Sequence, residues 1–521
     1  MLNDGKILIG KAGEKEITLN LKMANRHGLI AGATGTGKTT TLKVLAESFS
    51  AAGVPVFFAD VKGDLGSIAL EGEPSENAES RIESMGLRDL GFRYDSFPAT
   101  FWDVYGESGL PLRTTVSEMG PLLFAEILNL NDTQRDVLSV IFKIADDEDL
   151  LLIDIKDLKA MVRYVAEKRQ EYAYSYGNLA PQTLAAITRS LVSLEAEGGE
   201  QFIGEPAMDI RDWLTTDENG KGTVQVMDCR KLILAPKMYS MFLMWLLSEL
   251  FEVLPEVGDP EKPRLVFFFD EAHLLFEGAP KALITKIEQV VKLIRSKGVG
   301  IYFITQSPSD FPDGVLAQLG NKIQHALHAY TPAEMKKLRA AAEAFRENPE
   351  FNTLDTLQEL GVGKAIVSVL DEEGVPTVAE ITKICPPESF MGTLDDDTRA
   401  VLVAGCALRE KYQETVDRDS AFEFMERRRI EADDIAAQNA AEKEKAAKEA
   451  AEKKEKEKKQ TAEEKRAARE AEKIAKTGAG TVGREFGKTV GGAIGGSFGK
   501  KLGGNLGAAL GRGLIGTFFH N

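Results

Sequence analysis

This chain has few of the residues needed for disulfide bonds or for a cysteine-based zinc site. Its 521 residues include three cysteines, Cys229, Cys385 and Cys406, which are odd in number and widely spaced. A disulfide framework or a zinc site needs more cysteines at closer, regular spacings. The sequence therefore predicts a protein of a reducing compartment, and we expect it in the cytoplasm.

Long apolar runs and a secretory leader are also missing. Residues 239–254 form the longest apolar stretch with helical character, but Glu249 and Glu252 interrupt it. A membrane-spanning helix needs about 20 predominantly apolar residues, so a buried core helix is the better interpretation. Residues 1–10 are mixed in polarity and include Asp4, which does not fit a signal peptide.

Positive charge is scarce over most of the chain. The formal net charge is −17, and it divides into −24 for residues 1–435 and +7 for residues 436–521. Affinity for a polyanion comes from clusters of Lys and Arg, so any nucleic-acid contact of the acidic body must be local. Hydrophobic residues make up 43% and aromatic residues 7%, as in a soluble globular protein, and the length suits two or three domains.

One glycine-rich stretch carries a strong chemical signal. Residues 32–39 read Gly-Ala-Thr-Gly-Thr-Gly-Lys-Thr, after an apolar run at 28–31 and before a helix-compatible run. Glycines let backbone N–H groups surround a polyphosphate, and the next helix directs its positive N-terminus at the same charge. The lysine can reach the β- and γ-phosphates, and the threonine hydroxyl can bind Mg²⁺. The expected nucleotide-binding residues are Gly32, Ala33, Thr34, Gly35, Thr36, Gly37, Lys38, Thr39 and Thr40.

A second motif supplies carboxylates to the same chemistry. Residues 264–269 are mostly apolar and are followed by Asp270 and Glu271, as expected for a buried parallel strand that ends at a site. In a P-loop NTPase such a strand provides an Asp for Mg²⁺. We therefore expect Thr39 and Asp270 to hold Mg²⁺ and Glu271 to orient or deprotonate the attacking water. The two motifs together predict a Mg²⁺-dependent ATPase.

Further strands and helices place other polar residues at the same edge. Strands are expected at residues 28–31, 53–60, 223–228, 264–269, 298–305 and 321–329, with a closing hairpin at 364–370 and 375–381, and helices at 38–52, 235–254 and 281–297. Asp60, Lys62 and Asp64 follow one strand, where open α/β sheets bind ligands, although a plain polar turn explains them equally well. Gln306 ends another strand, where a γ-phosphate sensor would lie.

Composition suggests an order of segments along the chain. We expect a small β cap at 1–24, an ATPase core at 25–66 and 221–390, and a mainly helical insertion at 67–220. A helical segment follows at 391–435. Residues 436–476 are Ala, Glu, Lys, Arg and Gln with charge pairs at i,i+4, typical of a solvated, semi-rigid helical spacer without coiled-coil heptads.

The last segment, 477–521, has glycine at every fourth position from 483 to 511. Such spacing weakens a lone helix but suits close backbone packing between helices. A flexible tail, self-association and contact with a membrane surface all remain open for it.

Several blocks together resemble one family. They are the sequence around the phosphate loop (25–39), Ala-Asp-Val-Lys-Gly-Asp (59–64), Phe-Phe-Asp-Glu-Ala-His (268–273), the block 293–306 and the block 320–327. Together they resemble the bacterial HerA-like helicase C-terminal family, related to HerA and FtsK-type DNA pumps, over roughly residues 1–390. The last two blocks make the resemblance specific, because the phosphate loop and the carboxylate strand are shared by many NTPases.

The resemblance implies a RecA-like α/β fold and a hexameric ring ATPase, with HerA relatives threading duplex DNA. It implies Gln306 as the sensor and Arg295 as the arginine that reaches the neighbouring subunit's γ-phosphate. Lys322 and His328 stand where the family would have arginines, which puts a contact between subunits there in doubt, since Lys cannot reproduce the planar fork of Arg. The leading hypothesis is an ATP-driven ring motor acting on DNA. The alternative is an ATPase acting on a protein or membrane-associated partner.

Overall fold

A computed structural model of the chain describes residues 1–277 and 279–477. Residues Met1–Arg427 form one compact unit, and Arg428–Asn521 belong to a second. The described residues of the second unit continue the single helix α16 (Ala421–Thr477), whose charged side chains from Arg427 onward are exposed wherever their burial is described. The glycine-rich tail lies outside the described residues.

One sheet organises the first unit. Among the described residues, thirteen strands join in the order β1-β2-β13-β12-β11-β4-β10-β9-β5-β8-β6-β7, with β3 paired to β2. The strands are β1 (Leu2–Asn3), β2 (Lys6–Ala12), β3 (Lys15–Asn20), β4 (Gly28–Ala31), β5 (Val56–Asp60), β6 (Ala99–Asp103), β7 (Leu110–Pro111), β8 (Val224–Asp228), β9 (Leu265–Phe269), β10 (Val299–Thr305), β11 (Asn321–His325), β12 (Lys364–Ser368) and β13 (Glu380–Ile384). All pairings from β11 to β7 are parallel. The expected α/β fold with a mainly parallel central sheet is confirmed.

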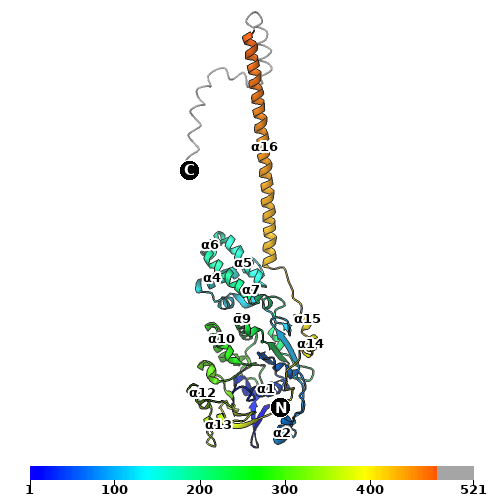
Figure 1. Cartoon of the computed structure of the whole chain (residues 1–521), viewed down its shortest axis with the longest axis vertical. Helices are drawn as coiled ribbons and strands as arrows, with labels where there is room; N and C mark the ends of the chain where they lie inside the picture. The colour runs from blue at the N-terminus through cyan, green and yellow to red at the C-terminus, as the bar shows by residue number, and fades with distance from the viewer. Residues whose placement is uncertain (278, 478–521) are drawn as a thin grey trace. The chain divides into compact units, whose positions relative to one another are not determined.

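Before α16, the described residues form fifteen α-helices, of which α1 packs on one face of the sheet and α9 and α10 on the other. They are α1 (Lys38–Ala51), α2 (Glu76–Ser84), α3 (Val116–Ile127), α4 (Asp132–Asp147), α5 (Ile155–Glu167), α6 (Arg169–Tyr176), α7 (Pro181–Ala196), α8 (Gly199–Phe202), α9 (Pro236–Val253), α10 (Lys281–Leu293), α11 (Asp313–Leu316), α12 (Pro332–Glu343), α13 (Thr353–Glu359), α14 (Asp396–Ala404) and α15 (Arg409–Tyr412). Helices α4, α5, α6 and α7 gather in one group (Figure 1). This group explains the helical periodicity between the two nucleotide motifs.

Side chains from the same strands divide between two hydrophobic cores. Phe267 and Phe269 of β9 pack into the core shared with α9 and α10, whereas Val266 and Phe268 pack into the core shared with α1. Successive side chains of a strand point to opposite faces, so a strand buried on both faces reads as a continuous apolar run. This is why the sequence of each central strand shows no alternation.

The N-terminal hairpin belongs to the same sheet as the phosphate loop. β2 and β3 are antiparallel, and β2 also pairs with β13 through Gly10 with Ile384 and Lys11 with Lys383. A Cβ at position 10 would lie 2.2 Å from the carbonyl oxygen of Lys383, so this close approach requires glycine. The hairpin is therefore an extension of the central sheet, and residues 67–220 likewise contribute β6 and β7 to it. The domain boundaries expected from the sequence stay predictions.

The closing hairpin is shifted from its predicted position. Its second strand is Glu380–Ile384 and pairs antiparallel with β12, whereas the sequence pattern predicted residues 375–381. Pro376 has no N–H to donate and makes only an isolated bridge with Leu370. Pairing therefore begins beyond the proline.

A buried histidine beside β10 makes the stability of the fold depend on pH. His27 Nε2 lies 2.7 Å from the carbonyl oxygen of Val291, and Nδ1 lies 3.0 Å from the amide nitrogen of Ile301. The carbonyl accepts and the amide donates, so the ring is neutral with its proton on Nε2. Burial lowers the pKa of His27 to about 4, although the hydrogen bond to Val291 acts in the opposite direction.

Replacing His27 with Gln should make the free energy of unfolding depend less on pH below neutrality. The unfolded state binds a proton near pH 6.5 and the folded state only near 4, so His27 costs stability as the pH falls through this range. Between pH 7 and pH 5 the native protein should lose about 2 kcal/mol more of its free energy of unfolding than His27→Gln. Urea unfolding followed by tryptophan fluorescence at both pH values measures this difference. Equal losses in the two proteins would contradict a neutral His27.

Candidate nucleotide-binding site

The phosphate loop joins β4 to α1, and three of its glycines adopt left-handed backbone conformations. The φ angles are 151° at Gly32, 77° at Gly35 and 113° at Gly37. A Cβ at Gly32 would also lie 2.5 Å from the Cβ of His325. Such conformations are strained for other residues, and they allow the backbone N–H groups to turn toward one anion. The loop therefore has the shape that its sequence predicts.

Lys38 lies within this loop at the start of α1. Its Nζ donates hydrogen bonds to the carbonyl oxygens of Gly32, at 2.7 Å, and Ala33, at 3.0 Å. Burial lowers the pKa of Lys38, while the nearby charges of Glu271 and Asp270 act against that shift. Thr39 and Thr40 follow in the first helical turn and are half-buried. The lysine, the helix N-terminus and the two carboxylates thus surround one space.

A histidine that the sequence did not single out for the site supports the loop from behind. His325 ends β11, and its Nδ1 donates to the carbonyl oxygen of Lys364 at 3.1 Å while Nε2 accepts from the Thr41 hydroxyl at 2.9 Å. Burial lowers its pKa to about 4, so the ring is neutral near pH 7. The amide of Gly363 also donates to the carbonyl oxygen of Thr36 at 3.0 Å. The loop is held from β11 and from the turn before β12.

Asp270 and Glu271 follow β9 and point to the same space. The Asp270 side chain is 4% exposed, and its Oδ2 makes no hydrogen bond among the described residues. Lys62 Nζ lies 3.3 Å from this oxygen and 2.6 Å from Glu271 Oε1. Lys62 comes from the segment after β5, which pairs with β9 in the sheet. The sequence left a plain polar turn as an alternative for Lys62, and the structure places it on the carboxylate pair.

The three charges shift one another's protonation. Burial raises the pKa of Asp270, against the opposing effect of Lys62. Burial would also raise the pKa of Glu271, but the hydrogen bond and charge of Lys62 outweigh it and hold this pKa below its usual range. Burial would lower the pKa of Lys62, but Asp270 and Glu271 raise it. Glu271 is therefore an ionised carboxylate, as a group that orients or deprotonates water must be.

Hydrogen bonds to Asp60 shape the turn that carries Lys62. The Asp60 carboxylate accepts hydrogen bonds from the amides of Gly63, at 2.7 Å, and Leu65, at 3.2 Å. Burial raises the pKa of Asp60 to about 7. Asp64 follows in the same turn, and its buried Oδ1 has no hydrogen-bond partner among the described residues. Asp60 thus shapes the turn, and Lys62 makes the contact with the site.

The residues present fit a magnesium ion and a nucleotide. Within residues 1–277 and 279–477, no group of three or more His, Cys, Asp and Glu residues is arranged to hold a metal. Mg²⁺ in nucleotide sites takes one or two protein oxygens and completes its shell with phosphate and water. The buried Asp270 oxygen without a hydrogen bond and the hydroxyl of Thr39 are suited to this role. Their assignment stays a prediction.

Gln306 and Arg295 lie at opposite ends of β10. Gln306 follows the strand, is exposed, and lines a cavity of about 620 Å³ together with Ala33, His273 and His328. Arg295 precedes the strand and pairs with Asp259 at 2.8 Å. Seven residues of strand span roughly 20 Å, so Arg295 cannot reach the phosphate loop of its own chain. Its proposed action on a neighbouring subunit remains a prediction.

The two departures from the family pattern have different surroundings. His328 lines the cavity beside the phosphate loop. Lys322 lies on β11 and donates to the carbonyl oxygen of Ala344 at 3.0 Å, and burial lowers its pKa. Of the two, His328 is the residue positioned near the nucleotide site.

The parallel sheet, the glycine loop after β4 and the carboxylate pair after β9 define a RecA-like P-loop NTPase. The chain belongs to the Helicase HerA-like C-terminal family, whose model matches residues 6–505. The resemblance inferred from the sequence motifs is thereby confirmed.

A solved structure shares this fold, and two more with lower TM-scores are similar over most of the chain. The bacterial conjugative coupling protein TrwB in its unbound monoclinic form aligns with a TM-score of 0.50 and 15% identity, over 75% of this chain and 91% of its own. TrwB in complex with ADP and Mg²⁺ gives 0.48 and 16%, over 75% and 94%. VirB4 of Thermoanaerobacter pseudethanolicus gives 0.46 and 17%, over 74% and 97%. No curated protein matches the sequence significantly.

Removing the lysine between the carboxylates should make Mg²⁺ bind more easily. Lys62 neutralises Asp270 and Glu271, so it competes with the cation for the same oxygens. Lys62→Met should lower the Mg²⁺ concentration for half-maximal binding of a fluorescent ADP analogue by about tenfold, equivalent to roughly 1.4 kcal/mol. Lys22→Met is the control, because Lys22 forms an exposed pair with Glu261. An unchanged Mg²⁺ midpoint in Lys62→Met would exclude this competition.

Proposed function

We propose that this chain is a Mg²⁺-dependent ATPase and one subunit of a ring motor that moves duplex DNA. The observation that carries the proposal is the convergence of Lys38, Asp270 and Glu271, whose charges influence one another's pKa values. Membership of the HerA-like family supports it.

Each group has a chemical role in the proposed reaction. ATP is the source of the phosphoryl group, and a bound Mg²⁺ would supply positive charge that neutralises part of the charge developing on it. Glu271 orients the attacking water and takes its proton, Lys38 draws negative charge off the γ-phosphate, and Gln306 senses that phosphate at the end of β10. Thr39, at the start of α1, and Asp270, after β9, would hold the metal ion.

The proposed ring explains how Arg295 would act. Arg295 lies at the N-terminal ends of the parallel strands, and its own phosphate loop lies at their C-terminal ends. In this proposal Arg295 therefore acts only on the nucleotide of a neighbouring subunit. A hexamer is the assembly that the family resemblance implies. Release from Asp259 would free the guanidinium for such a contact, and its planar fork suits a phosphate.

Stimulation by DNA tests the motor proposal. The full chain is assayed for steady-state ATP hydrolysis at low salt with and without linear duplex DNA, because phosphate contacts weaken steeply as salt rises. We expect the rate to rise several-fold with DNA and to vanish in Lys38→Ala. A hydrolysis rate that neither single- nor double-stranded DNA changes would exclude the DNA motor but not the ATPase activity.

The second candidate function replaces DNA with a protein or membrane-associated partner. The net charge of −24 over residues 1–435 favours it, because an acidic surface repels a polyanion outside local basic regions. No helix within residues 1–277 and 279–477 is long and apolar enough to cross a membrane. A partner of this kind would stimulate hydrolysis in the same assay where DNA does not.

A further inference from the structure

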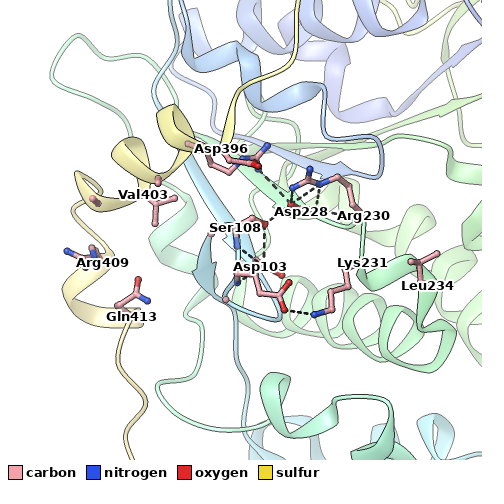
Figure 2. Close-up of a pocket in the computed structure, with 16 residues that line it drawn as sticks. Asp103, Ser108, Asp228, Arg230, Lys231, Leu234, Asp396, Val403, Arg409 and Gln413 are labelled. Carbon is pink, nitrogen blue, oxygen red and sulfur yellow. Dashed lines mark hydrogen bonds and ion pairs between the residues drawn. The ribbon is translucent and has the colours of Figure 1, made fainter.

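A second cavity lies beside the far part of the sheet, away from the phosphate loop. It has a volume of about 750 Å³ and is lined by the ends of β6 and β8 and by α14 and α15. Figure 2 shows Asp103, Ser108, Asp228 and Arg230 on one side and Val403, Arg409 and Gln413 on the other. Ligand sites of small molecules are commonly about 300–1,000 Å³. The carboxyl ends of parallel strands are also where open α/β sheets bind ligands.

Arg399 is a buried cation in this cavity with unused hydrogen-bonding capacity. Its side chain is 4% exposed, and its Nε has no hydrogen-bond partner among the described residues. Its ion pair with Asp228 spans 3.8 Å, which is too long for a hydrogen bond. The guanidinium lies over the ring of Phe101, with its carbon 5.2 Å from the ring centroid. A buried guanidinium nitrogen without a partner is costly, so the arrangement indicates a ligand that accepts a hydrogen bond from Nε.

Two carboxylates of the cavity, Asp103 and Asp228, are already occupied by donors. Asp228 accepts hydrogen bonds from Arg230 Nη2 at 2.5 Å, from the Arg230 backbone amide at 3.0 Å and from the Ser108 hydroxyl at 2.7 Å. Asp103 accepts from the amides of Tyr105, Glu107 and Ser108. At the rim, Lys231 pairs with Glu107. Within the described lining, the buried donor left without a partner is the Nε of Arg399, while Arg409 and Asp396 are exposed at the rim.

We propose that this cavity is a second ligand site, which binds the phosphate group of a small phosphorylated molecule through Arg399 and through Arg230, which would exchange its contact with Asp228 for the ligand. Arginine suits such a ligand because its planar donors pair with two phosphate oxygens at once. The inference goes beyond the proposed motor function and does not depend on it.

A single turn, which carries Lys62 and Gly63, lies between this cavity and the carboxylates Asp270 and Glu271. A Cβ at Gly63 would lie 2.9 Å from Cδ of Arg230, and Gly63 follows Lys62, which holds Asp270 and Glu271. The amide of Cys229 also donates to the carbonyl oxygen of Asp60 at 2.9 Å. An anion that draws Arg230 away from Asp228 would thus act on the turn that carries Lys62. The proposed site therefore lies next to the turn that carries Lys62.

Calorimetric titration with pyrophosphate tests the proposal in the full chain. The Lys38→Ala background weakens the phosphate loop so that the second site dominates. We expect saturable binding in Lys38→Ala, and at least tenfold weaker binding when Arg230→Gln or Arg399→Lys is added. Arg211→Gln is the matched control, because Arg211 pairs with Asp209 outside this cavity. Thermal unfolding of each variant checks that it is folded. If Arg399→Lys proves unstable, the result for Arg230→Gln, at a partly exposed residue, decides the test.

The outcomes separate the possibilities. Absence of binding in Lys38→Ala, or binding that Arg230→Gln leaves unchanged, overturns the proposal. Where the proposal holds, titration with ADP and with inorganic phosphate distinguishes the source of the phosphate group. ADP that binds at least as tightly as pyrophosphate identifies a nucleotide, and exclusion of ADP identifies a free phosphate or pyrophosphate. The proposed function is tested separately by DNA stimulation, so failure of either leaves the other standing.

Discussion

Glu271→Gln should lower the turnover number for ATP by about 10²–10⁴-fold while leaving nucleotide binding nearly intact. Glutamine keeps the shape of the side chain but cannot take a proton from water, and general-base catalysis contributes factors of this size. The ionised state of Glu271, maintained by Lys62, is what the substitution removes. The measurement is single-turnover ATP hydrolysis together with equilibrium binding of a fluorescent ATP analogue.

The control for this experiment is a carboxylate outside the site. Glu261→Gln removes an exposed partner of Lys22 and should leave both rate and binding unchanged. Hydrolysis that continues at the native rate in Glu271→Gln would contradict the assignment of the general base. Loss of nucleotide binding as well would show that Glu271 has a structural part in the loop.

Lys38→Ala should remove both tight nucleotide binding and hydrolysis. Its ammonium is the cation inside the phosphate loop, and loss of one preorganised donor to developing charge commonly costs about 10²–10³-fold in rate. The expected result is a fall in kcat/KM of at least about 10²-fold, measured by steady-state hydrolysis over a range of ATP concentrations. Unfolding midpoints should stay close to those of the native protein, because the hydrogen bonds lost run only to carbonyls of the loop itself.

The control for Lys38→Ala is a lysine outside the nucleotide-binding site. Lys22→Ala removes an exposed ion pair, and exposed pairs contribute little to stability, so its hydrolysis should match the native rate. A Lys38→Ala protein that retained native kcat/KM would exclude the phosphate loop as the site of catalysis.

The strands and the phosphate loop could be predicted because their signals are local. A buried parallel strand such as β9 is a short apolar run bounded by polar residues, and the glycine loop depends on backbone conformations that few other residues adopt. The bounds of β4 agree with the expected residues 28–31. The class of site and the fold therefore followed from residues close together in the chain.

Other features depend on contacts between distant segments, which a local pattern does not contain. Lys62 meets Glu271 only because β5 lies beside β9, and His325 supports Thr41 only because β11 lies beside β4. The cavity around Arg399 likewise joins α14 to the ends of β6 and β8. The shifted β13 shows the same limit, since its register follows from the bridge at Pro376 and its pairing with β12.

The pairing of β2 with β13 also has a consequence for folding during synthesis on the ribosome. The two strands are synthesised roughly 370 residues apart, which takes about 20–75 s at typical elongation rates. Until Lys383 and Ile384 emerge, the edge of β2 that faces β13 has no partner there, and an unpaired strand edge is a template for aggregation. Nascent chains that stop before β13 should therefore need chaperone protection that the full-length chain does not need.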